Sequence, residues 1–157
     1  MKLTLVVVGK VRGELAPAVA EYERRAARYW RLAVEEVSAG SPGARDDAEA
    51  VMAAEAERIL GRIPEGAAVA LLTRAGRALP SRQLARWLRD QAAARSAGVA
   101  LVIGGAYGVH SSVSEGAAMH VCLSALTLPH ELARLVLAEQ LYRAGTILRG
   151  EPYHKGP

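Results

Sequence analysis

Short apolar runs alternate with helix-forming stretches along all 157 residues, and this alternation constrains the fold more than any other feature. Apolar runs of about four to eight residues are typical of strands, and nearly continuous runs suit strands that are covered on both faces. The predicted strands are 3–8, 32–37, 67–72, 99–103 and 120–123. The predicted helices are 15–30, 46–60, 81–97 (with Ser81 as its N-cap), 112–118 and 129–148. The pattern predicts an α/β fold with a mainly parallel sheet flanked by helices.

Length and composition favour one globular domain over residues 1–157. Hydrophobic residues make up 51% of the chain and charged residues 23%, which excludes a disordered polar chain. No apolar run approaches the roughly 20 residues of a membrane span, and the apolar start lacks a signal-peptide cleavage site. One cysteine, Cys122, and four histidines without ligand spacing predict no internal disulfide and no metal site. We therefore expect a cytoplasmic enzyme with no membrane partner.

The glycines after the fourth predicted strand form the first candidate binding feature. Residues 101–108 read LVIGGAYG. Open α/β sheets bind ligands at the carboxyl ends of their strands, and glycine lets a backbone approach a ligand closely. Neither G-x-G-x-x-G nor G-x-x-x-x-G-K-[ST] occurs, so a dinucleotide fingerprint and a P-loop are excluded. The glycines alone indicate either a ligand-binding turn or a simple tight turn.

Two later segments carry further candidate residues. Residues 123–130, LSALTLPH, join the last predicted strand to the last predicted helix. Small and apolar residues with proline near a helix start suit a rigid loop that binds a nucleobase, or a buried connection without a ligand. Residues 150–155, GEPYHK, form either a frayed terminus or a lid that brings titratable groups to a site.

Neither the charge of the chain nor the apolar periodicity of its last predicted helix decides whether RNA or a second chain binds. The net charge of +4 and the arginine-rich stretches 24–31 and 74–89 permit RNA contacts but equally suit solvated surfaces. The last predicted helix carries two apolar stripes, whereas a helix outside a monomeric sheet needs only one. The first stripe is Leu128, Leu132, Leu135 and Val136, and the second is Leu137, Leu141, Ala144 and Leu148. Two stripes indicate either a partner chain or a deeply buried helix.

Taken in order, these segments resemble one family. Residues 101–105, 123–130, 141–144 (LYRA) and 152–155 (PYHK) are similar to the small SPOUT-class methyltransferases. The resemblance spans the whole chain and points to the bacterial H-type family, which methylates N3 of a pseudouridine in 23S ribosomal RNA. It implies a C-terminal trefoil knot that holds S-adenosylmethionine, and a homodimer whose last helices pack together. Topology rules treat knots as nearly absent, so the residues alone do not predict one.

The resemblance also implies the functional residues. The implied cofactor contacts are Leu72, Gly105, Leu123, Ser124, Ala125, Leu126, Thr127 and Leu128. Methylation at N3 needs a base for the imide proton or a cation that stabilises the developing anion. We hypothesise that His154 and Arg143 supply these roles and that Tyr153 helps to place the base. The expected substrate is the assembled ribosome, because so small a chain has no separate RNA-binding domain.

The chain departs from the family pattern at two places. Thr73 stands where the family often has aspartate, so a polar cofactor contact is missing or supplied elsewhere. Only Arg45 follows Gly40–Ala44, where the family commonly has a lysine-rich loop. Two other classes of protein are compatible with the residues. One is a nucleotide- or flavin-binding α/β module, and the other is a non-catalytic ribosome-binding protein that uses its arginines.

Overall fold

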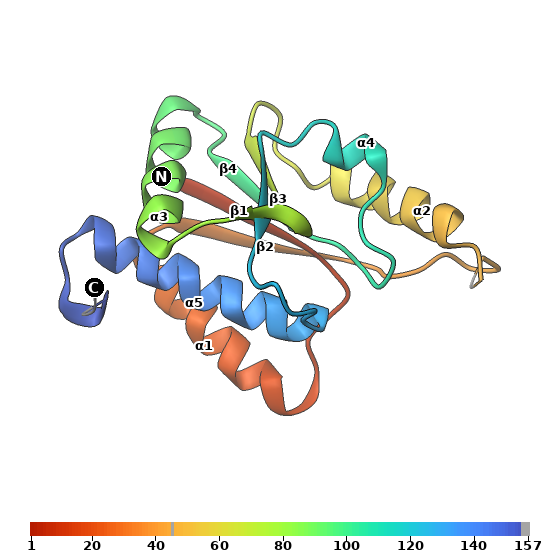
Figure 1. The fold of residues 1–157 in the computed structure, drawn as a ribbon, viewed down its shortest axis with the longest axis horizontal. Coiled ribbons are helices and arrows are strands. Elements are labelled where there is room, and N and C mark those ends of the chain that lie inside the picture. The colour runs from red at the N-terminus through yellow and green to blue at the C-terminus, as the bar shows by residue number, and fades with distance from the viewer. Residues whose placement is uncertain (45, 155–157) are drawn as a thin grey trace.

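Five parallel strands form one sheet at the centre of the molecule (Figure 1). The computed structural model describes residues 1–44 and 46–154, so Arg45 and Lys155 lie outside the described residues. The strands are β1 (Lys2–Val8), β2 (Arg31–Val37), β3 (Ala68–Ala78), β4 (Val99–Ile103) and β5 (Met119–Cys122). Their order is β2-β1-β4-β3-β5, and every neighbouring pair is parallel. The predicted α/β fold with a parallel sheet is confirmed.

Helices cover both faces of this sheet (Figure 1). They are α1 (Ala16–Ala26), α2 (Ala48–Leu60), α3 (Ser81–Ala94), α4 (Ser111–Ser114) and α5 (His130–Leu148), with short 3-10 helices η1 (Gly13–Leu15) and η2 (Pro152–His154). One face packs against α1, α3 and α5, and the other packs against α2 and α4. Leu5 and Leu101 point to the first core, whereas Val6 and Val102 point to the second. Burial on both faces explains why these strands are continuously apolar.

Strand β3 is longer than its apolar run predicts. Leu72 and Arg77 both pair with Val121, so the four residues between them bulge out of the ladder and the strand then continues to Ala78. Gly76 allows this bulge, because a Cβ there would lie 2.6 Å from the carbonyl carbon of Val121. The bulge projects beside the carboxyl end of β5, where the predicted cofactor loop begins.

The start of α3 differs from the prediction. Pro80 occupies the N-cap position, and no side chain caps the helix. Ser81 is the first helical residue, and its hydroxyl donates instead to Gln140 Oε1 of α5 over 2.6 Å. The prediction that Ser81 is the N-cap is therefore wrong, and its side chain joins two neighbouring helices.

The two apolar stripes of α5 have different environments. Leu137, Leu141 and Ala144 are fully buried in the core shared with α1 and α3. The other stripe is only partly covered, and Leu132 retains 37% of its exposure. The second stripe therefore belongs to the chain's own core, and only the first remains for a partner.

Candidate active site

Segments that the sequence singled out meet at the carboxyl edge of the sheet. In β3, Leu72 pairs with Ile103 of β4 and with Val121 of β5. Because all three strands are parallel, the turn after β4 and the loop after β5 leave the sheet on either side of Leu72. We call Leu72, Gly105 and residues 123–128 the cradle.

Gly105 lies in the turn after β4, directly against helix α2. A Cβ at this position would lie 2.6 Å from Glu55 Oε2 and 2.9 Å from Glu55 Oε1. Glycine is thus required here by a carboxylate that is only 3% exposed, and not only by the approach of a cofactor. Sequence reasoning missed Glu55. Its spacing from the buried Val51 and Ile59 of α2 places it on the inward face of that helix, which is a signal that could have found it.

The backbone of the cradle loop takes no part in a backbone ladder among the described residues. Within residues 1–44 and 46–154, no backbone–backbone hydrogen bond involves residues 124–128. Cys122 Sγ donates to the Ser124 carbonyl over 3.0 Å, and the Leu126 N–H donates to Ser124 Oγ over 2.9 Å. The Leu126 side chain is 75% exposed. Open amides beside exposed apolar side chains match the needs of a purine ring, so these residues fit the adenosyl group of S-adenosylmethionine.

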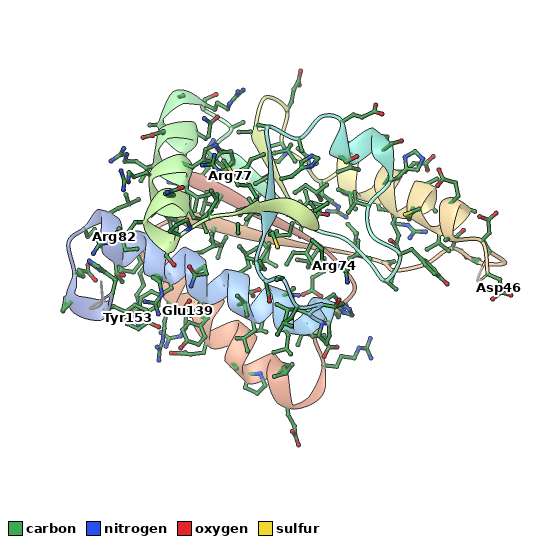
Figure 2. All side chains as sticks on the ribbon, in the orientation of Figure 1. Asp46, Arg74, Arg77, Arg82, Glu139 and Tyr153 are labelled. Atoms are coloured by element: carbon green, nitrogen blue, oxygen red, sulfur yellow. The ribbon has the colours of Figure 1, made fainter. Side chains whose placement is uncertain are left out.

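A side chain from the β3 bulge braces this loop. Arg74 Nη1 donates to Thr127 Oγ1. Figure 2 places Arg74 near the start of α5, where the loop ends. Where the family often has aspartate at position 73, this chain has Thr73, and the neighbouring Arg74 supplies a polar group to the loop.

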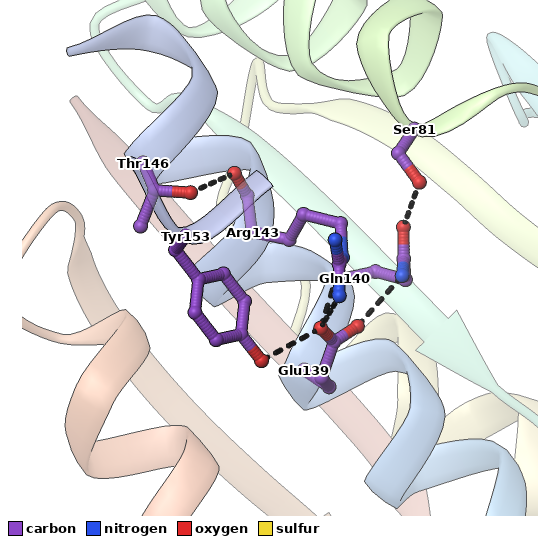
Figure 3. Close-up of polar contacts among 6 residues, drawn as sticks. All are labelled: Ser81, Glu139, Gln140, Arg143, Thr146 and Tyr153. Carbon is purple, nitrogen blue, oxygen red and sulfur yellow. Dashed lines mark hydrogen bonds and ion pairs between the residues drawn. The ribbon is translucent and has the colours of Figure 1, made fainter. Parts of the chain in front are cut away.

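Two of the three predicted catalytic residues, Arg143 and Tyr153, meet at the far half of α5 (Figure 3). Glu139 Oε1 accepts hydrogen bonds from Arg143 Nε over 2.9 Å, from Arg143 Nη2 over 2.7 Å and from the Tyr153 hydroxyl over 3.1 Å. Sequence reasoning missed Glu139, although its spacing of four residues from Arg143 is that of a helical ion pair. His154 follows in η2, and its Nδ1 is buried without a hydrogen-bond partner among the described residues.

These contacts fix the charge states of two of the residues. The hydrogen bond to Glu139 raises the pKa of Arg143, so its guanidinium remains a cation. Burial, followed by hydrogen bonds with Tyr22 and Glu139, raises the pKa of Tyr153. The Tyr153 phenol therefore remains neutral near pH 7 and serves as a donor, not as a base.

The network continues from the tail to α3. Glu139 Oε2 accepts from Gln140 Nε2 over 2.6 Å, and Gln140 Oε1 accepts from Ser81 (Figure 3). Tyr153 also packs on Tyr142, with ring centroids 4.5 Å apart. Residues 149–154, which we call the tail, are thus held against α5 by named contacts.

Within one chain, the cradle and the catalytic residues lie at opposite ends of α5. The helix begins at His130, and a rise of 1.5 Å per residue places Arg143 about 20 Å further along its axis. Figure 2 shows the same separation, with Arg74 near the start of α5 and Tyr153 near its other end. The structure brings the predicted cofactor residues together and the predicted catalytic residues together, but it keeps the two groups apart.

Within residues 1–44 and 46–154, no group of three or more His, Cys, Asp or Glu residues is placed to hold a metal ion. None of the helices described there combines the length and apolar character that crossing a bilayer requires.

Comparison with known proteins gives consistent matches. The family model described as "Predicted SPOUT methyltransferase" matches residues 1–154. Ribosomal RNA large subunit methyltransferase H of Gemmatimonas aurantiaca is 50% identical over 157 residues, covering 99% of this chain and 100% of the relative. The protein of the same name from Syntrophotalea carbinolica is 41% identical, covering 98% and 99% of the two chains. The crystal structure of TrmJ from Z. mobilis superposes with a TM-score of 0.52 at 15% identity, covering 100% of this chain and 72% of that one, which shows a shared fold.

Proposed function

Because this chain belongs to the SPOUT methyltransferase family, we propose that it methylates N3 of a pseudouridine in 23S ribosomal RNA with S-adenosylmethionine as donor. We place this reaction on the assembled ribosome in the cytoplasm. The relatives named for large-subunit ribosomal RNA match nearly the whole chain, which supports RNA as the substrate. The observation that carries the proposal is the convergence of Leu72, Gly105 and residues 123–128 at one edge of the sheet.

We assign the cofactor to the cradle. Leu72, Leu123 and Leu128 are half-buried around the loop and offer apolar contacts to an adenine ring. Backbone N–H groups of residues 124–128 other than that of Leu126, which donates to Ser124 Oγ, offer hydrogen bonds. When bound, S-adenosylmethionine supplies a methyl group that its sulfonium already activates. The remaining tasks of the protein are to align N3 with that methyl group and to remove the N3 proton.

We assign removal of the N3 proton to the tail, together with Arg143 of α5. His154 Nδ1 has no partner among the described residues and can accept the imide proton of N3. Arg143 remains cationic and can stabilise the anion that develops on the base. Tyr153 remains a neutral donor that ties the tail to Glu139 and so positions His154.

These assignments require a homodimer. Because about 20 Å of helix separates Arg143 from the start of α5, the tail of one chain must serve the cradle of its partner. The partly exposed stripe of Leu128, Leu132, Leu135 and Val136 is the surface on which we place that partner. This stripe begins in the cradle at Leu128 and continues along the first half of α5 towards the tail, which suits a contact that brings cradle and tail together.

The family fold also implies a trefoil knot, which we propose for the C-terminal segment. Two contacts support a close passage of this segment past the β3 bulge. Arg74 reaches Thr127, and Gly76 packs on the backbone of Val121.

Methyl incorporation tests the proposed function. Ribosomes that lack the modification should accept a labelled methyl group from S-adenosylmethionine, and mapping should locate it on N3 of one pseudouridine. Calorimetry should detect binding of S-adenosylhomocysteine but not of flavin. RNA binding without methyl transfer would favour the non-catalytic ribosome-binding class instead, and flavin binding would favour the nucleotide- or flavin-binding class.

The base and the dimer have separate tests. With saturating cofactor and single turnover, His154→Ala should abolish transfer, whereas His110→Ala, on the α4 side of the sheet, should not. Full turnover of His154→Ala would refute the base assignment. Co-expression of His154→Ala with Gly105→Val should restore activity, because a mixed dimer keeps one intact cradle facing one intact tail. A mixture as inactive as either variant would refute the shared site.

A further inference from the structure

A pocket outside the cradle lies beside the glycine turn after β4. It has a volume of about 470 Å³ and is lined by residues 39–42 after β2, by Val51, Glu55 and Arg58 of α2, and by Ala106 and Tyr107 after β4. In the sheet, β4 stands between β2, whose end lines this pocket, and β3 and β5, whose ends carry the cradle. The turn after β4 is therefore a wall common to both sites.

The position of this pocket in the topology favours a ligand. From β1 the chain moves outward to β2, then crosses back to the opposite side of the sheet to form β3. The strand order thus reverses beside β1, and open α/β sheets bind ligands at the carboxyl ends of strands at such a point. The proposed function so far uses only the cradle side of this edge.

Glu55 gives the pocket an unsatisfied hydrogen-bond acceptor. Its side chain is 3% exposed, and Oε1 accepts the Gly40 N–H over 2.8 Å. Oε2 is buried and has no partner among the described residues. Buried carboxylate oxygens are rarely left without a donor, because the lost hydration is not replaced. A ligand that carries an N–H group would complete this site.

The loop that lines the pocket beside the Glu55 carboxylate is held in place by hydrogen bonds. Arg58 Nη1 donates to the carbonyls of Ser38 over 2.8 Å and of Gly40 over 2.7 Å, which fixes the loop after β2. Tyr107 contributes a half-exposed ring at the rim. An aromatic ring beside a fixed acceptor is the usual arrangement for an unstacked RNA base.

The chemistry of the proposed substrate matches this acceptor. Pseudouridine is joined to its ribose through C5, so it carries an N1–H that uridine lacks. N1–H and N3 lie on either side of the C2 carbonyl, so a carboxylate that binds N1–H leaves N3 open to the methyl donor. A buried acceptor that loses its donor is penalised strongly, which makes such a contact selective.

We propose that this pocket receives the target pseudouridine and that Glu55 Oε2 accepts its N1–H, so that Glu55 sets the preference for pseudouridine over uridine. This inference rests on the proposed function. It assigns Glu55 to the recognition of the base, distinct from the cradle that holds the cofactor and from the tail that removes the N3 proton.

The test compares two substrates in two variants. Ribosomes carrying pseudouridine or uridine at the target position are methylated under single turnover with excess enzyme, so that slow transfer to uridine can be measured. The variants are Glu55→Gln and, as a matched control, Glu57→Gln, which makes the same chemical change on an exposed face of α2. Because the result is a ratio of two rates, the fraction of folded enzyme cancels.

Wild-type protein and Glu57→Gln should favour pseudouridine. Glu55→Gln should lower kcat/KM on pseudouridine by about tenfold or more, the loss expected for one hydrogen bond to a charged group, with little change on uridine. Its affinity for S-adenosylhomocysteine should be unchanged.

Three results would overturn the inference while leaving the proposed function intact. Equal losses on both substrates would show that Glu55 only supports the glycine turn. A matching loss of S-adenosylhomocysteine affinity would show that it serves the cofactor. A wild-type enzyme that methylates uridine and pseudouridine equally well would show that N1–H is not read. Absence of wild-type methylation on either substrate would instead refute the proposed function itself.

Discussion

Arg134 ties the first half of α5, which follows the cradle, to α1 and β2. Its Nε donates to Glu23 Oε1 over 2.8 Å, and its Nη2 lies 3.3 Å from Glu23 Oε2 and 3.5 Å from Glu36 Oε1. The Arg134 side chain is 7% exposed and that of Glu23 is 16% exposed. Removing the Arg134 guanidinium alone would leave the Glu23 carboxylate without its ion-pair partner and with little exposure to solvent. Replacing both Arg134 and Glu23 with apolar residues would leave no unpaired buried charge.

We expect Arg134→Met to lower the free energy of unfolding by about 3 kcal/mol, the lower end of the usual cost of breaking a buried pair, because Glu36 keeps contact with water. At about 2–4 °C per kcal/mol for a chain of this size, the Tm should fall by about 6–12 °C. The double variant Glu23→Met, Arg134→Met should recover most of this loss, because apolar replacements of a buried pair are often neutral.

Urea unfolding at one fixed protein concentration measures these changes, since concentration affects the apparent stability of a dimer. The fluorescence of Trp30 is a suitable probe. Its ring is buried in the core on the side of the sheet that α1, α3 and α5 cover, and its Nε1 donates to the Leu141 carbonyl over 2.9 Å. A loss below about 1 kcal/mol for Arg134→Met, or a double variant as unstable as the single one, would refute the reasoning that the pair is shielded from water.

Three further changes have expected outcomes. Gly105→Ala should weaken S-adenosylhomocysteine binding in calorimetry, because its Cβ would lie 2.6 Å from a buried carboxylate oxygen, whereas Gly61→Ala, whose Cβ would stay 3.5 Å from its nearest neighbour, should not. A hydrogen bond to the Glu151 carboxylate in the tail raises the pKa of Tyr29 from 10.0 to about 12. The contribution of this hydrogen bond to stability is therefore complete below pH 10 and is lost as the pH rises towards 12. Thermal melts should therefore fall more steeply over this range in the wild type than in Tyr29→Phe, and equal slopes would contradict the assignment. Leu132→Asp should produce a folded monomer in analytical ultracentrifugation. Leu137→Asp should instead unfold the protein, because Leu137 is fully buried in the chain's own core. A Leu132→Asp variant that remains a folded dimer would rule out this face of α5 as the interface.

The strands were predictable because burial on both faces leaves an uninterrupted apolar run. For β4 the predicted and observed bounds are the same. The second half of β3 was not predictable, because most of its residues are exposed and Arg74 and Arg77 are among them. Its pairing depends on a bulge opposite Val121, and that bulge is set by a contact between strands that sequence periodicity does not record.

The roles of single residues in the site depended on contacts across the chain. Helical spacing could have shown that Glu55 faces inward, but only the strand order places it under the turn that contains Gly105. Periodicity likewise detected two apolar stripes on α5. The positions of α1 and α3 determine which stripe belongs to the core, because these helices bury Leu137 and leave Leu132 partly exposed.

The geometry of α5 and the path of the tail support the proposed second chain. From Leu148 to His154 the chain could extend by about 20 Å, whereas the helix runs back about 27 Å from Leu148 to His130, so even a fully stretched tail falls short of the start of the helix. The tail instead turns through η2 and stops where Tyr153 meets Glu139. Nine residues of helix, about 13 Å, still separate Glu139 from His130, where the cradle ends. Contacts around Tyr142 and Glu151 hold the tail in that place, so under the proposed assignments Tyr153 and His154 reach a cradle only if another chain provides it.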